Sequence, residues 1–195
     1  GLPMAAEAVE GSVRFTEAGL HEGNLRSRLL GGETVLVAAQ RDGQLFVQGQ
    51  GVVTAQGLAP VVGTRIAARI SGAANWSGTW QGKRETGELH AEADLRGLKV
   101  TLPAPLNRPE RLADEKLLVR TESARPGNIL LALHVGDRMN GRIALARQTE
   151  GWSFAGARIN FGGAPATAPT TRDVYVRADL AEVNADQWLP LFGGG

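Results

Sequence analysis

Strict alternation of polar and apolar residues marks the segment from residue 88 to residue 95. The polar set is Glu88, His90, Glu92 and Asp94, and the apolar set is Leu89, Ala91, Ala93 and Leu95. Successive side chains of a strand point to opposite faces, so each set occupies one face. This pattern predicts an antiparallel strand with one wet face and one half-buried face.

The residues that follow this strand predict a bend and then a stop. Arg96-Gly97 interrupts the alternation, which is typical of a bulge or bend. Apolar positions resume at Leu98, Val100 and Leu102. Pro103 and Pro105 end the pattern, because proline lacks the N–H that a sheet ladder needs.

Similar patterns recur along the whole chain. They predict strands near residues 9–16, 24–30, 33–40, 45–51, 65–71, 76–81, 116–121, 128–135, 138–147, 152–161 and 173–180. Asp42-Gly43, between two strand-like segments, predicts a hairpin turn. Residues 107–115 predict a polar loop or short helix, residues 162–170 a flexible connection, and Asn184 the start of a short terminal helix.

These elements predict an all-β fold with at most one or two short helices. Twisted open sheets seldom exceed ~10 strands without curling or splitting into two layers. The predicted sheet must therefore close, stack as a sandwich or curve into a trough. We expect a single curled antiparallel sheet over residues 1–195.

Charge and composition exclude several classes of protein. The chain has 21 Lys+Arg and 20 Asp+Glu, a formal net charge of +1. This balance gives no broad basic surface for nucleic acid or an anionic membrane. The chain has no cysteine, which excludes a disulfide scaffold and thiolate metal sites. Its apolar runs are too short for a transmembrane segment.

The residues offer little catalytic or metal-binding chemistry. Glu88, His90 and Glu92 share a strand face and could hold a divalent ion, but a solvated polar face is the favoured interpretation. No nucleophile elbow, zinc-protease or phosphate-loop motif occurs. We therefore predict no enzymatic activity, no cofactor and no metal site.

Two questions stay open at the level of the residues. Trp76, Trp80 and Trp152 could stack on sugars, although such residues more often fill the core at a sheet edge. The apolar strand faces could form a dry core or the wall of a groove for an apolar ligand.

Several segments resemble the AsmA-like family, most closely its YhdP branch. These are Ser71-Gly72 leading to Trp76, the strand ending 94–98, the motif Leu102-Pro103-Ala104-Pro105-Leu106 with Pro109, and the ending Asn184-Ala185-Asp186-Gln187-Trp188-Leu189. The leucine-proline-x-proline-leucine motif is the most specific of them. The match covers residues 70–190, whereas residues 1–69 agree only in their strand-rich character.

The resemblance implies a taco-shaped β-sheet with an elongated hydrophobic groove that carries phospholipid between the inner and outer membranes of a Gram-negative bacterium. It also implies a periplasmic location, with the full-length protein anchored in the inner membrane. We accordingly expect this chain to be a segment of a longer protein, with phospholipid acyl chains and neighbouring segments of that protein as its partners.

The expected groove residues are the apolar positions of the predicted strands. They are Ile66, Ile70, Leu89, Leu95, Val100, Leu131, Leu133, Val174 and Val176. The alternative hypothesis is a closed β-sandwich that binds envelope polysaccharide as an adhesion module. An open apolar trough or two sheets sealed face to face would distinguish these hypotheses.

Overall fold

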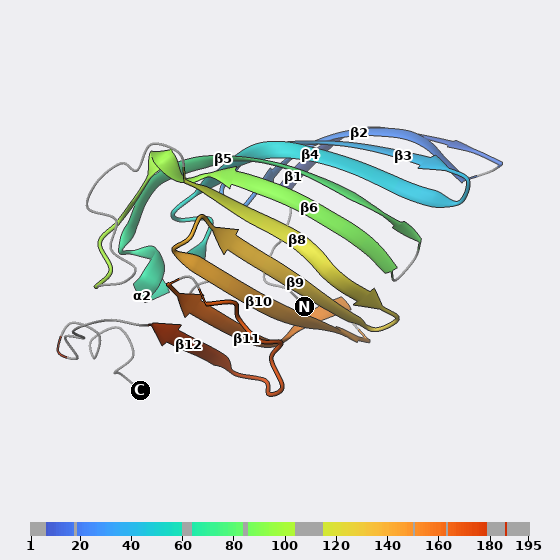
Figure 1. Ribbon diagram of the computed structural model, residues 1–195. Helices are drawn as coiled ribbons and strands as arrows, with labels where there is room; N and C mark the ends of the chain where they lie inside the picture. The colour runs from blue at the N-terminus through green and yellow to red at the C-terminus, as the bar shows by residue number, and fades with distance from the viewer. Residues whose placement is uncertain are drawn as a thin grey trace.

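The computed structural model describes residues 7–17, 19–59, 64–83, 86–103, 115–149, 151–162, 164–178 and 186. These residues form one open, curled β-sheet (Figure 1). The prediction of an all-β fold is confirmed. The predicted terminal helix at Asn184 and the predicted loop at 107–115 lie outside the described residues, apart from Asp186 and Glu115.

The strands follow the sequence-based expectation closely, and most are a few residues longer. They are β1 (Glu7–Thr16), β2 (Gly19–Leu29), β3 (Gly32–Arg41), β4 (Gln44–Thr54), β5 (Ile70–Lys83), β6 (Thr86–Asp94), β7 (Leu98–Val100), β8 (Lys116–Arg125), β9 (Asn128–Val135), β10 (Met139–Gln148), β11 (Gly151–Phe161) and β12 (Val174–Ala178). Two short helical turns, α2 (Thr64–Ala67) and η1 (Leu95–Gly97), complete the described elements.

The sheet is built from neighbours in the chain. Its order is β1-β2-β3-β4-β5-β6-β8-β9-β10-β11-β12, and β7 pairs with β5 beside this path. All pairs are antiparallel except the pair of β11 and β12, which is parallel. The described strands form one sheet, and no second sheet faces it within the described part of the chain. The structure therefore does not favour the sealed-sandwich hypothesis.

The two ends of the sheet differ. The helix end carries α2, η1 and the turn at Leu30-Gly31, and the hairpin end carries the turns at Asp42-Gly43 and Pro126-Gly127 (Figure 1). The hairpin predicted at Asp42-Gly43 is confirmed, with φ values of 52° and 70°. Two successive positive φ values are typical of the two-residue turn that matches the twist of antiparallel strands.

The strand predicted at residues 65–71 is wrong. Residues Thr64–Ala67 form α2, in which the N–H of Ala68 donates to the carbonyl oxygen of Thr64 at 2.9 Å, and β5 begins only at Ile70. Ala67 is buried and Ala68 is exposed, the reverse of what the alternation predicts. Three apolar positions are too few to separate a strand from a helical turn, and alanine and arginine favour the helix.

The bend predicted after β6 is confirmed as the turn η1. The carboxylate of Asp94 accepts the backbone N–H of Arg96 at 3.0 Å, which caps the turn. The chain then pairs Ile70 with Val100 as β7 returns along the start of β5.

A crossover joins β11 to the parallel strand β12. The connection, residues 164–173, packs against the polar side of the sheet, where the Arg142 guanidinium donates to the carbonyl oxygen of Ala166. The Asn160 side-chain amide donates to the carbonyl oxygen of Pro165 at 2.9 Å. Ala166 is only 3% exposed. The segment predicted as a flexible connection is thus held against the sheet at Ala166, while Thr167 and Ala168 are exposed.

Candidate functional site

The strand ladders separate the sheet into two faces of opposite character. One row of paired residues runs across all eleven strands of the path and contains no polar side chain. It consists of Gly11, Leu25, Leu36, Gly49, Gly78, Ala91, Val119, Leu133, Gly141, Ile159 and Val176. We call the face that bears this row the inner face.

The row beside it, on the opposite face, is mostly polar. It consists of Ser12, Asn24, Val37, Gln48, Thr79, His90, Arg120, Ala132, Arg142, Arg158 and Tyr175. We call this the outer face. The same contrast holds along single strands: in β6 the inner positions Leu89, Ala91 and Ala93 are half-buried, and the outer positions between them are exposed.

The sheet bends toward the inner face. A Cβ atom on Gly78 would lie 3.0 Å from the Cβ of Ala91, and one on Gly141 would lie 3.5 Å from the Cβ of Leu133. Directly opposite Cβ atoms of antiparallel strands are usually ~4.5–5.5 Å apart. Inner-face side chains therefore converge, which explains why they are half-buried although no second layer covers them among the described residues.

Tryptophan and glycine shape the middle of the inner face. The Trp80 indole lies over Gly87, where a Cβ would come within 2.5 Å of the ring. A Cβ on Gly49 would lie 2.8 Å from Cδ2 of Leu36 and 3.0 Å from the edge of the Trp76 ring. Each ring thus approaches the backbone of a neighbouring strand at a position where that strand has a glycine.

The structure brings five of the nine predicted groove residues onto the inner face. Leu89, Leu131 and Leu133 are half-buried there on β6 and β9. Val174 and Val176 lie on the edge strand β12, where they are 60% and 51% exposed. These five share one surface with the apolar row, and whether they contact a ligand stays a prediction.

The other four predicted groove residues gather at the helix end. Ile66 is half-buried in α2 and Leu95 is half-buried in η1. Ile70 and Val100 pair with each other where β5 meets β7. They belong to the closing elements of the sheet, and no ladder of the main path places them on the inner face.

Sequence reasoning missed much of the apolar surface on the C-terminal strands. The inner positions not singled out include Leu117, Val119, Ile129, Val135, Ile143, Leu145, Phe154, Ile159 and Phe161. Two-residue alternation within each strand was the available signal. A bulge between Ala144 and Leu145 shifts the register of β10 against β11, so alternation counted through β11 assigns half of that strand to the wrong face.

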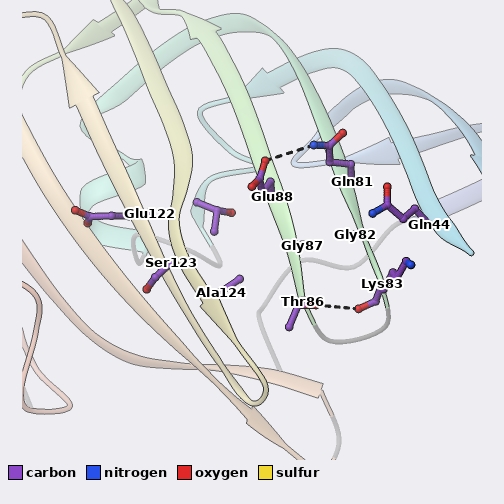
Figure 2. Close-up of a pocket in the computed structure, with 11 residues that line it drawn as sticks. Gln44, Gln81, Gly82, Lys83, Thr86, Gly87, Glu88, Glu122, Ser123 and Ala124 are labelled. Carbon is purple, nitrogen blue, oxygen red and sulfur yellow. Dashed lines mark hydrogen bonds between the residues drawn. The ribbon is translucent and has the colours of Figure 1, made fainter.

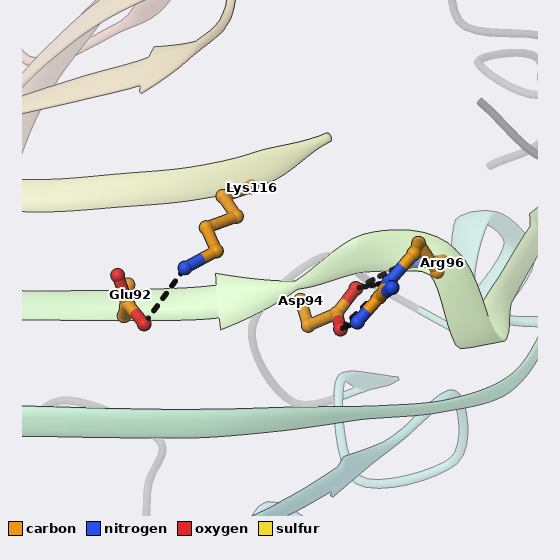
Figure 3. Close-up of polar contacts among 4 residues, drawn as sticks. All are labelled: Glu92, Asp94, Arg96 and Lys116. Carbon is orange, nitrogen blue, oxygen red and sulfur yellow. Dashed lines mark hydrogen bonds and ion pairs between the residues drawn. The ribbon is translucent and has the colours of Figure 1, made fainter. Parts of the chain in front are cut away.

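Several charged side chains of the outer face and of the adjoining turn form ion pairs. The Lys116 ammonium lies 3.1 Å from the Glu92 carboxylate, and Asp94 holds the Arg96 guanidinium (Figure 3). Hydrogen bonds from Arg142 lower the pKa of Glu122. Such exposed pairs contribute little to stability, but they keep this face wet.

The outer face also carries the residues considered for metal binding. Glu88, His90 and Glu92 are exposed side by side on β6, as the solvated-face interpretation predicts. Within the described residues no group of three or more His, Asp or Glu side chains could hold a metal ion. Two shallow depressions of about 340 and 360 Å³ lie among polar side chains of this face.

The larger depression marks a place where the sheet opens. The ladder of β6 and β8 covers only His90–Asp94 and Lys116–Arg120, so the two strands separate toward the hairpin end. The Thr121 hydroxyl accepts the Leu89 backbone N–H at 2.9 Å, in place of a carbonyl of the missing ladder. Figure 2 shows the resulting wedge, with Glu88 and Gln81 on one side and Glu122 on the other.

Comparison with known proteins gives one match. The family model described as YhdP protein matches residues 1–194. The chain belongs to the YhdP family. The resemblance carried by the tryptophan, leucine-proline and terminal segments is thereby confirmed. No curated protein and no solved structure matches this YhdP-family chain.

The helical elements in the described part of the chain are the short turns α2 and η1. None of its helices has the length and the apolar character needed to cross a bilayer.

Proposed function

We propose that this YhdP-family chain carries phospholipid by holding the acyl chains on its inner face, without catalysing any reaction. The observation that supports the proposal most directly is the row of paired residues that crosses eleven strands without a polar side chain. Monomeric proteins rarely leave so large an apolar surface without a ligand or partner.

The dimensions of the inner face suit an acyl chain. A strand of ten residues such as β10 is ~33 Å long. One leaflet accounts for about half of the ~30 Å hydrocarbon core of a bilayer, so an acyl chain in a membrane extends ~15 Å. An acyl chain can therefore lie along one strand, or across several strands, and stay in contact with apolar side chains.

The energetics favour transport by sliding. The free energy of transferring a methylene group from water to an apolar environment is favourable by about 0.8 kcal/mol. Moving a whole acyl chain from a membrane into water therefore costs on the order of 10 kcal/mol. Contact with a continuous apolar face offsets part of this free-energy cost wherever the acyl chain lies on the face. The barrier to movement along it is then small, because neighbouring positions are similar and no bond is made or broken.

Family membership also underlies the proposed location. We infer that the chain works in the periplasm of a Gram-negative bacterium as a segment of a longer protein anchored in the inner membrane. Its partners would be phospholipid acyl chains and the neighbouring segments of the same protein.

The direct test is to identify what the protein carries. We expect native mass spectrometry and lipid extraction of the chain, secreted to the periplasm of a Gram-negative host, to show bound phospholipid. Leu133→Glu places a charge in the apolar row and should reduce the bound lipid at least fivefold, since an unpaired charge there opposes acyl contact.

Leu118→Glu is the matched control for Leu133→Glu. Leu118 is a leucine of the neighbouring strand that lies on the outer face, 46% exposed. This variant should keep the lipid content of the wild type. Equal lipid content in both variants, or wild-type protein that takes up no acyl-chain probe after delipidation, would refute the proposal.

A further inference from the structure

The inner face carries a single charged side chain among the described residues that the ladders of the main path place there. This side chain is Arg147, which pairs with Trp152 at the hairpin end of β10 and β11. The few other polar inner positions are uncharged; they are Ser27, Thr34, Gln40 and Thr121. A lone guanidinium at the end of an apolar surface is the arrangement that an anionic amphiphile requires.

The Arg147 side chain is oriented by an aromatic platform. Its guanidinium carbon lies 5.9 Å from the centroid of the Trp152 ring. A cation–π contact holds the guanidinium near the ring and uses none of its N–H donors, which can bind a planar or tetrahedral anion. No described residue forms an ion pair with Arg147, whereas Arg142 and Arg158, on the outer face of the same two strands, have carboxylate partners.

The position of Arg147 also allows its charge to stay hydrated. Arg147 is exposed and Trp152 is half-buried, so the pair lies where the apolar surface meets water. Next to them on the inner face come Leu145 and Phe154, which also pair with each other. An acyl chain lying on these residues would place its phosphate beside Arg147 without burying that charge.

We propose that Arg147, supported by Trp152, binds the phosphate of a lipid whose acyl chain lies on the inner face. This inference rests on the proposed function and assigns a headgroup site to it. The recognised chemistry is a phosphate ester joined to an acyl chain. Free phosphate esters share the anionic group but lack the chain, and the experiment separates them.

The experiment compares three probes by titration calorimetry below their micelle concentrations. They are lysophosphatidylglycerol, a monoacylglycerol with the same acyl chain, and glycerol phosphate. We expect Arg147→Ala to weaken lysophosphatidylglycerol binding about five- to tenfold, as for loss of a charge-assisted hydrogen bond at an exposed site. Monoacylglycerol binding should change less than twofold, and glycerol phosphate should not bind measurably.

Two further arginine variants test whether the effect depends on the guanidinium group and on its position on the inner face. Arg147→Lys should fall between the wild type and Arg147→Ala, because it keeps the charge and loses the planar fork. Arg125→Ala should match the wild type, since Arg125 is also exposed at the hairpin end but lies on the outer face. Thermal unfolding of each variant shows whether the fold is kept.

The results separate failure of this inference from failure of the proposed function. If Arg147→Ala weakens both acyl probes equally, or neither, the phosphate site is refuted and acyl-chain binding stands. If no acyl probe binds the wild type, the proposed function fails as well. Glu150 follows closely in the sequence, so loss of the Arg147→Ala effect in a Glu150→Gln background would show that Arg147 acts through that carboxylate and would also refute the site.

Discussion

Glycine has a packing role at the centre of the inner face that its conformational freedom does not explain. Gly49 and Gly87 do not have the left-handed φ that side chains avoid. A Cβ on Gly87 would nevertheless collide with the Trp80 ring, and one on Gly49 would press on Leu36 and on the edge of the Trp76 ring. Small and large residues are therefore coupled across neighbouring strands. A larger side chain on one strand therefore displaces a tryptophan ring that belongs to the neighbouring strand.

Gly87→Ala is expected to destabilise the protein by about 1–3 kcal/mol, because the Trp80 indole must lift off the backbone. Gly23→Ala is the matched control. Gly23 is also an inner-face strand glycine, and its Cβ would meet only ordinary contacts at 3.8 Å or more. Urea unfolding followed by tryptophan fluorescence measures both, and equal stabilities of the two variants would contradict the packing role.

The cap of η1 gives a prediction about pH. Hydrogen bonds from the Arg96 side chain and backbone lower the pKa of Asp94 from 3.8 to about 2. A carboxyl group whose pKa is lower in the folded state stabilises the fold above the unfolded value. This contribution is therefore complete above about pH 4 and is lost as the pH falls through 2.

Arg96→Gln should raise the pKa of Asp94 by more than about one unit toward 3.8, and so weaken the loss of stability on acidification. Carboxyl carbon NMR titration of Asp94 measures the shift. Glu92→Gln, which removes the partner of Lys116 and leaves Arg96 in place, is the control and should keep the Asp94 pKa low. An unchanged Asp94 titration in Arg96→Gln would show that Arg96 is not the cause.

At the scale of elements, the sequence predicts most strands and fails where the local signal is short or unusual. The hairpin at Asp42-Gly43 was predictable because both residues tolerate positive φ. The turn at Leu30-Gly31 has the same backbone form, with φ values of 52° and 79°, but leucine gives no turn signal. Tertiary pairing of β2 with β3 imposes that conformation on Leu30.

The candidate surface was predictable in kind but not in extent. The alternation in β6 and β9 correctly placed Leu89, Leu131 and Leu133 on one face. It could not show which strands are neighbours, and so could not show that one apolar row crosses the whole sheet. The helical turn that holds Ile66 was missed because alternation over a few residues fits both structures.

The wedge between β6 and β8 allows an element-scale test. Thr121→Val removes the hydroxyl that accepts the Leu89 N–H and should cost about 0.5–1.5 kcal/mol. Amide hydrogen exchange at Leu89 should accelerate, while exchange within the β2–β3 ladder stays unchanged. Thr121→Ser keeps the acceptor and serves as the control. Unaltered exchange at Leu89 in Thr121→Val would show that the hydroxyl does not replace the ladder.

At the scale of the whole molecule, the sheet buries few large side chains. Among the described residues, the buried apolar ones are mostly alanines and valines, and most of the larger inner-face side chains, apart from Leu145 and Val135, stay partly exposed. A protein of this kind gains stability from any ligand that covers its apolar face. The free energy of unfolding then depends on how much of the protein has ligand bound to its inner face.

We expect lysophosphatidylglycerol at a hundred times its Kd to raise the free energy of unfolding by about 2.7 kcal/mol. Glycerophosphoglycerol, which has the same headgroup and no acyl chain, is the control and should not change it. Differential scanning calorimetry of delipidated protein measures both. Equal melting temperatures with and without the acylated compound would contradict ligand-linked stability.

The route of the crossover before β12 has a practical consequence. Because residues 164–173 cross the outer face of the sheet, they cover none of the inner face. Thr167 and Ala168 of this segment are exposed. A dye or affinity tag attached at either position would lie on the side of the outer face and would leave the inner face uncovered.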